Sequence, residues 1–399
     1  MSMRITRRAL LGTALAASAA RAQAAPIKIG DINSYTGQAA FTVPYRNGLR
    51  LALAEINAAG GVLGRPLELL LRDDGGKPED AVRHAGELTS SEGVVALTGT
   101  FASNIGLAVA DFAKRNRVPF LAAEALSDAL TWRQGNRYTF RVRSSTYMQA
   151  AMLAEQAARL PARRWAVVAP NYEFGLSATE SFRRLLSAAR PDVEWVAEQF
   201  PALGRLEAGP VVNALLAARP EAIFNATFGA DLVRLVRQGN DAGLFEGRSV
   251  VSVMTGQPEF LDPLGDEAPP GWIVTGYPWE QIATPAHQAF VAAYRRLAND
   301  TPRAGSLSGY VTLHALAAAL RKAGGTEPDR IVAALEDLVV ETPLGPIRFR
   351  ASDHQSTLGM YVGRLAVRGG RGVMVDAAYA DGARYLPPDD EVRRLRPQD

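Results

Sequence analysis

Polar and aromatic side chains gather where three predicted strands of the N-terminal third end. In an open parallel sheet, ligands bind beyond the carboxyl ends of the strands, where helix amino termini present unpaired N–H groups. Hydroxyl, N–H and carboxyl groups at such positions can hold a carboxylate, a carbonyl or an amide. The residues concerned are Tyr35 and Phe41 after the first strand, Phe101, Ser103 and Asn104 after a later one, and Glu124 and Ala125 after the next.

Two of these groups allow opposite interpretations. Ser103 or Asn104 is either the N-cap of the helix that follows, a satisfied helix start without a ligand, or a hydroxyl and N–H pair that grips a carboxylate. Glu124 ends an apolar strand, where burying a carboxylate is costly unless it has a partner. Glu124 therefore either faces solvent or directs its charge at a ligand, and it is the first candidate for the ligand-facing role.

Little in the sequence points to catalysis. The four histidines, His84, His287, His314 and His354, are scattered without metal-binding spacing, and the chain contains no cysteine. The chain has no G-x-S-x-G elbow and no P-loop, and no G-x-G-x-x-G follows its first strand. We therefore expect binding without chemistry, and neither a metal nor a cofactor.

The segments that position these residues alternate between short apolar strands and amphipathic helices. Leu49, Ala52, Leu53 and Ile56 give the first helix one apolar stripe, and Gly60-Gly61 ends it. The first series has strands at 27–32, 67–72, 94–98 and 118–122 and helices at 43–59, from 79 onward and at 103–114.

A second series repeats this rhythm further along the chain. Its strands lie near 165–169, 193–200, 221–226, 250–254 and 272–275, with helices near 176–188, 210–218 and 231–242. Apolar strands alternating with amphipathic helices predict parallel sheets covered on both faces. The predicted fold class is therefore α/β, with two doubly wound parallel-sheet lobes.

The last third of the chain departs from this alternation. Three helices at 285–298, 307–322 and 328–338 precede strands at 345–350 and 360–377, the latter turning around Arg368–Arg371. Residues 387–399 are polar and charged, and we expect them to form a loosely ordered C-terminal tail.

Residues 1–24 have the pattern of a signal peptide. They hold four arginines and no acidic residue, a short apolar stretch at 9–20, and Ala22-Gln23-Ala24 as a cleavage site. Arg7-Arg8 also matches a twin-arginine signal, and a general secretory signal is the alternative. The formal charge of the whole chain is +3, and the four arginines of residues 1–24 account for all of this excess. The chain without its leader is therefore close to neutral. We expect a periplasmic protein, cleaved near Ala24, that binds no nucleic acid and does not insert into a membrane.

The run from Ala54 to Pro66, closed by Asp73-Asp74, resembles the signature of the leucine/isoleucine/valine-binding family. Its members are the type I periplasmic solute-binding proteins of branched-chain amino-acid ABC transporters. The similarity continues with interruptions to Met360–Gly363 and covers nearly all of the mature chain. The resemblance implies two α/β lobes joined by a three-strand hinge, closure on a ligand between them, and delivery of that ligand to an inner-membrane permease.

The chain path implied by this resemblance passes between the lobes more than once. The first lobe comprises residues 25–143 and 279–347, and the second lobe comprises residues 144–278 and 348–386. A ligand-sensing subunit for a partner kinase or chemoreceptor is the alternative function on the same fold.

Only some of the family's site residues have a matching side chain in this sequence. The hydroxyl that fixes a ligand carboxylate falls on Ser103 or Asn104, whereas the Ala-Thr or Ala-Ser pair falls on Ala125-Leu126 and lacks its hydroxyl. The acid that pairs with an α-ammonium group falls on Val253. The aromatic positions expected to line the pocket are Phe41, Phe101, Phe174, Phe228 and Tyr277.

An ammonium group without its carboxylate partner is penalised by roughly several kcal/mol. The sequence therefore predicts an aromatic or short-chain carboxylate rather than leucine in the usual pose. In the alternatives, Glu124 supplies the missing charge from the opposite lobe or accepts hydrogen bonds from an amide.

Overall fold

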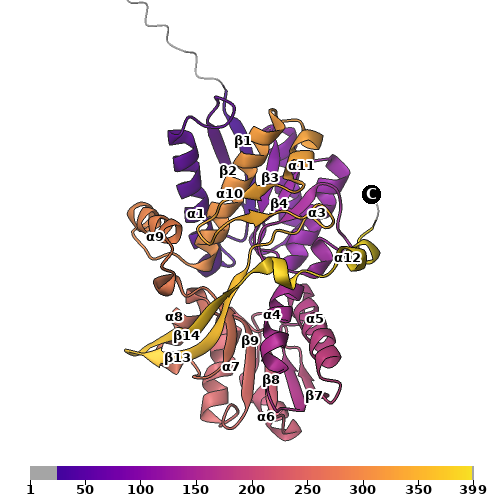
Figure 1. Ribbon diagram of the computed structural model, residues 1–399, viewed down its shortest axis with the longest axis vertical. Coiled ribbons are helices and arrows are strands. Elements are labelled where there is room, and N and C mark those ends of the chain that lie inside the picture. Colours follow the sequence, from indigo (N-terminus) through magenta and orange to yellow (C-terminus); the bar gives the residue numbers. More distant parts are fainter. Residues whose placement is uncertain (1–24, 398–399) are drawn as a thin grey trace, which may run out of the picture.

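The computed structural model describes residues 25–397, so the predicted leader lies outside the described residues. The chain forms two lobes, one above the other in Figure 1, and each has its own apolar core. No helix among residues 25–397 has the length and apolarity needed to cross a membrane.

The first lobe contains a five-stranded parallel sheet in the order β2-β1-β3-β4-β5. Ile27, Ile29 and Ile32 are fully buried, because helices cover both faces of the sheet. Its strands are β1 (Ile27–Asn33), β2 (Leu67–Asp73), β3 (Ala96–Gly99), β4 (Phe120–Ala122) and β5 (Thr139–Arg141).

Segments from both ends of the chain supply the helices of this lobe. Helix α1 packs against α9 and α10, whereas α2 packs against α3. The helices are α1 (Ala39–Ala58), α2 (Pro78–Ser90), α3 (Ser103–Asn116), α9 (Pro285–Ala298), α10 (Ala304–Ala323) and α11 (Pro328–Leu335). The short elements η1 (Asp128–Leu130), β11 (Val339–Val340) and β12 (Ile347–Arg348) complete it.

The second lobe repeats the strand order of the first and extends it by a hairpin. Its order is β7-β6-β8-β9-β10-β13-β14, in which only β13 and β14 run antiparallel to their neighbours. The strands are β6 (Arg164–Val168), β7 (Glu194–Gln199), β8 (Ala222–Asn225), β9 (Ser249–Gly256), β10 (Ile273–Gly276), β13 (Met360–Arg368) and β14 (Arg371–Ala380). The helices are α4 (Thr146–Ala157), α5 (Glu173–Ala189), α6 (Ala208–Ala218), α7 (Gly229–Asp241) and α8 (Pro258–Leu264), with η2 (Gly265–Glu267), η3 (Trp279–Gln281) and η4 (Gly382–Tyr385).

The predicted α/β class with two doubly wound lobes is therefore confirmed, and so is the three-strand hinge. The chain crosses between the lobes after β5, after β10 and before β13. Hydrogen bonds tie the first and third crossings together: Arg141 Nε donates to Gln355 Oε1 at 2.5 Å, and Gln355 Nε2 donates to the Arg143 carbonyl at 2.8 Å.

Among the elements that were not predicted, two contribute to the hinge region and the second lobe. Strand β5 is only three residues long, too short for a period-two pattern. Helix α4 is buried around most of its circumference, including Met148, Met152 and Leu153, so it has no polar face to reveal its period.

The expectation of a loosely ordered tail after residue 386 is wrong for the described residues. Helix α12 (Asp389–Leu395) lies beside the first lobe, with Val392 fully buried (Figure 1). The Arg396 guanidinium donates to the carbonyls of Thr131, Asn136 and Asp353 at 2.8–3.1 Å. These three carbonyls hold the end of the chain against the first lobe.

Helices α1 and α10 cross at glycines. A Cβ added at Gly309 would lie 2.1 Å from the Tyr45 carbonyl oxygen, and one added at Gly48 would lie 2.0 Å from the Ser306 carbonyl oxygen. The backbones of the two helices therefore touch.

We expect Gly309→Ala to destabilise the protein by about 1–3 kcal/mol, because the added methyl group must separate the two helices. Chemical denaturation measures this change. The matched control is Gly209→Ala on α6, where nothing lies within 4 Å of an added Cβ, and there we expect no loss of stability. Equal denaturation midpoints for the two variants would contradict the crossing.

Candidate functional site

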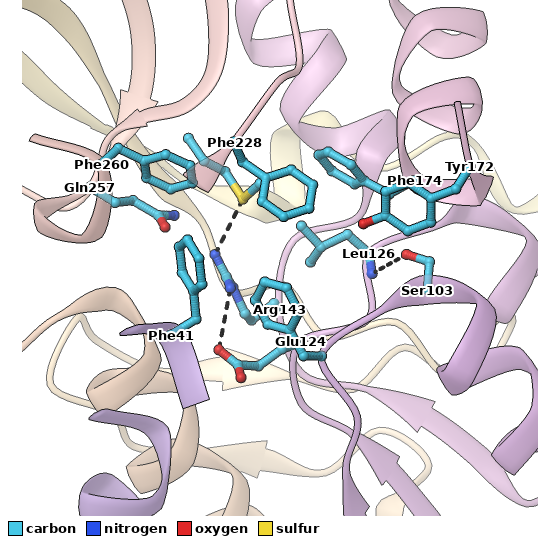
Figure 2. Close-up of a pocket in the computed structure, with 12 residues that line it drawn as sticks. Phe41, Ser103, Glu124, Leu126, Arg143, Tyr172, Phe174, Phe228, Gln257 and Phe260 are labelled. Carbon is cyan, nitrogen blue, oxygen red and sulfur yellow. Dashed lines mark hydrogen bonds and ion pairs between the residues drawn. The ribbon is translucent and has the colours of Figure 1, made fainter. Parts of the chain in front are cut away.

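A cavity lies between the lobes, with about 370 Å³ of empty space when the open solvent at its mouth is included. Its walls come mainly from the loops that follow strands β3, β4 and β5 of the first lobe and β6, β8 and β9 of the second. The lining residues are Phe41, Phe101, Ser103, Glu124, Leu126, Arg143, Tyr172, Phe174, Phe228, Met254, Gln257 and Phe260 (Figure 2).

Aromatic rings from the two lobes meet around this cavity. Phe41 stacks on Phe101 with ring centroids 5.0 Å apart, and it contacts Phe260 of the second lobe at 5.4 Å. Phe228 lies edge-on to both rings of the first lobe, at 6.3 Å from Phe41 and 6.1 Å from Phe101. Phe41 and Leu126 belong to the apolar cluster of the second lobe, although the first lobe supplies them. The lobes are therefore closed on each other.

A single guanidinium group stands among these rings. In Figure 2, Arg143 lies between Glu124 and a sulfur atom. Its Nη1 atom is 3.6 Å from Glu124 Oε1, and its Nη2 atom is 3.7 Å from Met254 Sδ. Arg143 has five N–H donors, and these two long contacts leave most of its capacity for a planar anion.

The Glu124 carboxyl group is buried, with its side chain 1% exposed. Burial raises the pKa of Glu124 to about 8, Arg143 opposes that shift, and the nearby Glu259 carboxyl group adds to it. Glu124 Oε2 has no hydrogen-bond partner. At pH 7 this carboxyl group is therefore mostly protonated, and the arginine is the dominant charge of the cavity wall.

Ser103 is not the N-cap that one interpretation of the sequence made it. Ala102 is the N-cap of α3, and no side chain caps the helix. The Ser103 hydroxyl group instead accepts hydrogen bonds from the backbone N–H groups of Leu126 at 3.2 Å and Ser127 at 3.1 Å. Two accepted bonds leave its own proton available as a donor.

Six of the ten predicted site residues line the cavity: Phe41, Phe101, Ser103, Glu124, Phe174 and Phe228. The other four lie elsewhere. Tyr35 donates to Asp31 Oδ2 at 2.5 Å, Asn104 is exposed, Ala125 packs against Gly106 of α3, and the Tyr277 hydroxyl group is 2.7 Å from His287 Nε2.

The structure also adds wall residues that sequence reasoning missed. Arg143 follows the unpredicted strand β5, and Gln257 and Phe260 lie at the start of α8. At the end of β9 the wall residue is Met254, whereas Val253 is buried in the core of the second lobe. Gln257 Nε2 is buried and has no hydrogen-bond partner.

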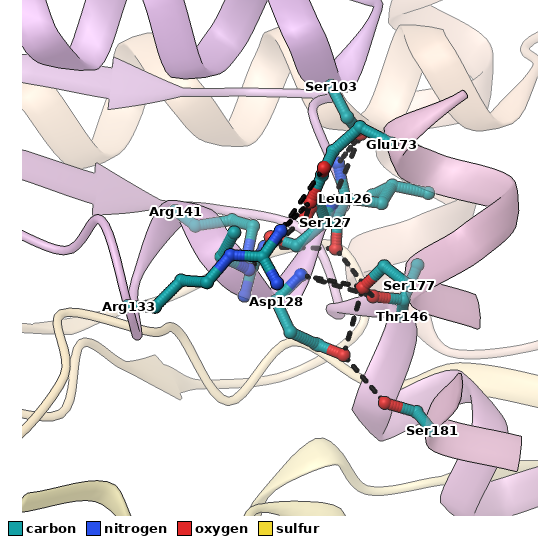
Figure 3. Close-up of polar contacts among 11 residues, drawn as sticks. Ser103, Leu126, Ser127, Asp128, Arg133, Arg141, Thr146, Glu173, Ser177 and Ser181 are labelled. Carbon is teal, nitrogen blue, oxygen red and sulfur yellow. Dashed lines mark hydrogen bonds and ion pairs between the residues drawn. The ribbon is translucent and has the colours of Figure 1, made fainter. Parts of the chain in front are cut away.

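A polar network beside the cavity joins the loop after β4 to helix α5 of the second lobe (Figure 3). We call it the latch; it comprises Ser127, Asp128, Glu173, Ser177 and Ser181. Ser127 Oγ donates to Glu173 Oε1 at 2.5 Å. Ser181 and Ser177 donate to Asp128 Oδ2 at 2.8 and 3.2 Å. The latch residues therefore join the two lobes in the closed structure.

The fold and the cleft together define the class of type I periplasmic binding proteins. The family model described as "Periplasmic binding protein" matches residues 26–371, and the chain belongs to this family. Leu/Ile/Val-binding protein homolog 7 of Brucella suis is 27% identical over 351 residues, which cover 84% of this chain and 86% of that protein.

Solved structures show the same fold. The solute-binding protein of an ABC transporter from Rhodopseudomonas palustris BisB5, in complex with 3,4-dihydroxybenzoic acid, has a TM-score of 0.79 at 24% identity and covers 90% of this chain and 98% of that chain. The leucine-, isoleucine-, valine-, threonine- and alanine-binding protein of Brucella ovis, in its closed conformation, has a TM-score of 0.80 at 21% identity and covers 93% and 100%.

We expect Asp128→Ala to loosen the closed lobes, because the Ser177 and Ser181 hydroxyl groups lose their acceptor at a cost of about 1–3 kcal/mol. Backbone amides of 173–184 should then exchange hydrogen roughly tenfold faster or more, as measured by mass spectrometry. The control is Asp111→Ala, which removes an exposed ion pair with Arg115 on α3 and should leave exchange in α5 unchanged. Equal exchange in α5 for both variants would show that the latch does not hold the lobes together.

Proposed function

We propose that the protein is the exported solute-binding component of an ABC importer and that it closes on a small aromatic carboxylate in the periplasm. The observation that carries this proposal is the Arg143 guanidinium group, directed into a cavity whose walls include five phenylalanine rings.

The charge of the cavity favours an anion. Arg143 contacts only Glu124 and Met254 among the cavity residues, both at long distance, and a ligand carboxylate can take two parallel N–H donors from a guanidinium group. The Gln257 amide, buried and unpaired at Nε2, is a further donor on the same wall. The protonated Glu124 carboxyl group and the Ser103 hydroxyl group can also donate to oxygen atoms.

The same charges disfavour an α-amino acid. An ammonium group needs a carboxylate partner in a buried site, but the end of β9 presents Met254, and Glu124 is mostly neutral at pH 7. The relatives named for leucine, isoleucine and valine therefore share the fold without fixing the ligand of this chain. The neighbour solved with 3,4-dihydroxybenzoic acid has the ligand chemistry that this cavity fits.

The shape of the walls favours a flat, apolar body. Phe41 and Phe101 come from the first lobe, and Phe228 and Phe260 come from the second, so a ring between them would contact both lobes. Aromatic pairs in stacked or edge-on contact stabilise by about 0.5–1.5 kcal/mol beyond the area they bury. A bound ring would therefore stabilise the closed form, in which the latch is also made, and the closed form is what a permease would recognise.

We expect titration calorimetry of the protein without its leader to show binding of benzoate and hydroxybenzoates and weaker binding or none of leucine. Arg143→Met should weaken benzoate binding about 100-fold or more, because removing one partner of a buried charge pair costs about 2–5 kcal/mol. The control is Arg115→Met, which removes a surface arginine of α3 and should bind as the wild type does. Tighter binding of leucine than of any aromatic carboxylate would overturn the proposal.

The transport role has a separate test in the source bacterium. Deletion of the gene should abolish uptake of radiolabelled benzoate at low concentration, and the wild-type gene but not the Arg143→Met gene should restore it. Normal uptake in the deletion strain would contradict the importer role even if the purified protein binds benzoate.

A further inference from the structure

Two buried carboxyl groups meet beside the one arginine of the cavity. The Glu259 side chain, on α8 of the second lobe, accepts a hydrogen bond at Oε1 from the Gly305 N–H at 3.0 Å. Glu124 Oε1 lies 3.4 Å from the position of a Cβ added at Gly305, so both carboxyl groups approach the same point of α10. Glu124 Oε2 and Glu259 Oε2 both lack hydrogen-bond partners.

More acidic than basic side chains surround Glu124. Asp31 on β1 lies near it, although the hydroxyl groups of Tyr35, Tyr45 and Thr98 all donate to Asp31. The charged or titratable groups that act on Glu124, element by element, are Arg143 after β5, Glu259 on α8, Asp31 on β1, Tyr35 after β1 and Tyr45 on α1. Arg143 is the only cation among them.

We propose that capture of the carboxylate solute takes up one proton, which Glu124 receives as the solute replaces it as the partner of Arg143. This inference rests on the function proposed above. Solute and proton then enter the closed cleft together, and the net charge buried around Arg143 does not change.

The physical reason is that one guanidinium group cannot neutralise two carboxylates in a site closed to water. In the closed structure, burial raises the pKa of Glu124 from its ordinary value of 4.5 to about 8. Opening the cleft to water lowers this pKa toward the ordinary value. A bound anion beside it raises that pKa further. Protonated Glu124 then donates its O–H to an acceptor instead of repelling it, and its unpaired Oε2 is a free position for that proton.

The sign of the pH dependence follows from linkage. Because the pKa of Glu124 is higher in the closed, liganded form, binding takes up a proton at pH values between the open-state and bound-state pKa values. Affinity is therefore greatest at low pH and falls as pH rises through that window, by up to about tenfold per pH unit. The effect opposes any loss of affinity from protonation of the solute itself below its own pKa.

The test is benzoate titration calorimetry at pH 6, 7 and 8, each in two buffers of different ionisation enthalpy, which counts protons directly. The wild type should take up close to one proton per benzoate and lose up to about tenfold in affinity per pH unit. Glu124→Gln, which resembles the protonated form, should take up none, lose the pH slope, and bind more tightly than the wild type at pH 8. Glu87→Gln, exposed on α2, should behave as the wild type does.

Two further measurements separate the outcomes. Glutamate labelled with carbon-13 at Cδ should show one resonance, absent in Glu124→Gln, that moves toward the protonated position when benzoate is added at pH 7.5. Loss of the pH slope in Glu259→Gln but not in Glu124→Gln would overturn the assignment to Glu124. Tight benzoate binding without proton uptake would overturn this inference and leave the proposed function standing, whereas failure to bind any aromatic carboxylate would overturn both.

Discussion

The arrangement of the site depends on one fully buried cation, Arg141, at the end of β5. A buried guanidinium group must satisfy its donors inside the protein, and burial lowers the pKa of Arg141 to about 10. Its Nη1 atom donates to the carbonyls of Leu126 and Ser127, Nη2 donates to Thr131 Oγ1, and Nε donates to Gln355. One side chain thus fixes the loop that carries both a cavity wall and the latch, and it ties that loop to the hinge.

The strand order of both lobes then places all the important loops at one interface. In each lobe the first five strands follow the same doubly wound order, so the carboxyl ends that carry the loops face the opposite lobe. Residues distant in sequence, such as Phe101, Phe228 and Phe260, become neighbours only because the sheets present these ends to each other. The three crossings of the hinge join the two lobes beside this interface.

Apolar and charged groups have different effects on the closed form. The phenylalanine rings supply contact area that both lobes share, and their burial favours closing without selecting a charge. In the proposed function, Arg143 and the carboxyl groups near it select the charge of the solute, because closing removes water from them and makes each unpaired group costly. The latch residues lie outside the cavity, so they stabilise the closed form whichever solute is present. In this proposal, different residues set affinity and selectivity.

The sequence by itself determined the alternation of strands and helices, the end of α1 at Gly60, and the turn between β13 and β14, because local patterns specify these features. It also indicated Glu124 and most of the phenylalanines of the cavity, because polar and aromatic residues at strand ends converge in this topology. The two series of strands and helices predicted the two lobes, and the family signature supplied their hinge. Those parts of the fold needed no knowledge of long-range contacts.

Only the tertiary structure decided which of these side chains face the cavity. Tyr35 and Tyr277 lie at the predicted loops but turn to partners inside the protein, Asp31 and His287, whereas Arg143 emerges from a strand too short to recognise. Met254 rather than Val253 lies on the wall, at a point where the backbone of Met254 is left-handed with φ 61° and the pairing of β9 with β10 is irregular. A side chain's direction depends on the register and packing of the whole lobe, and residue type and spacing alone do not specify either.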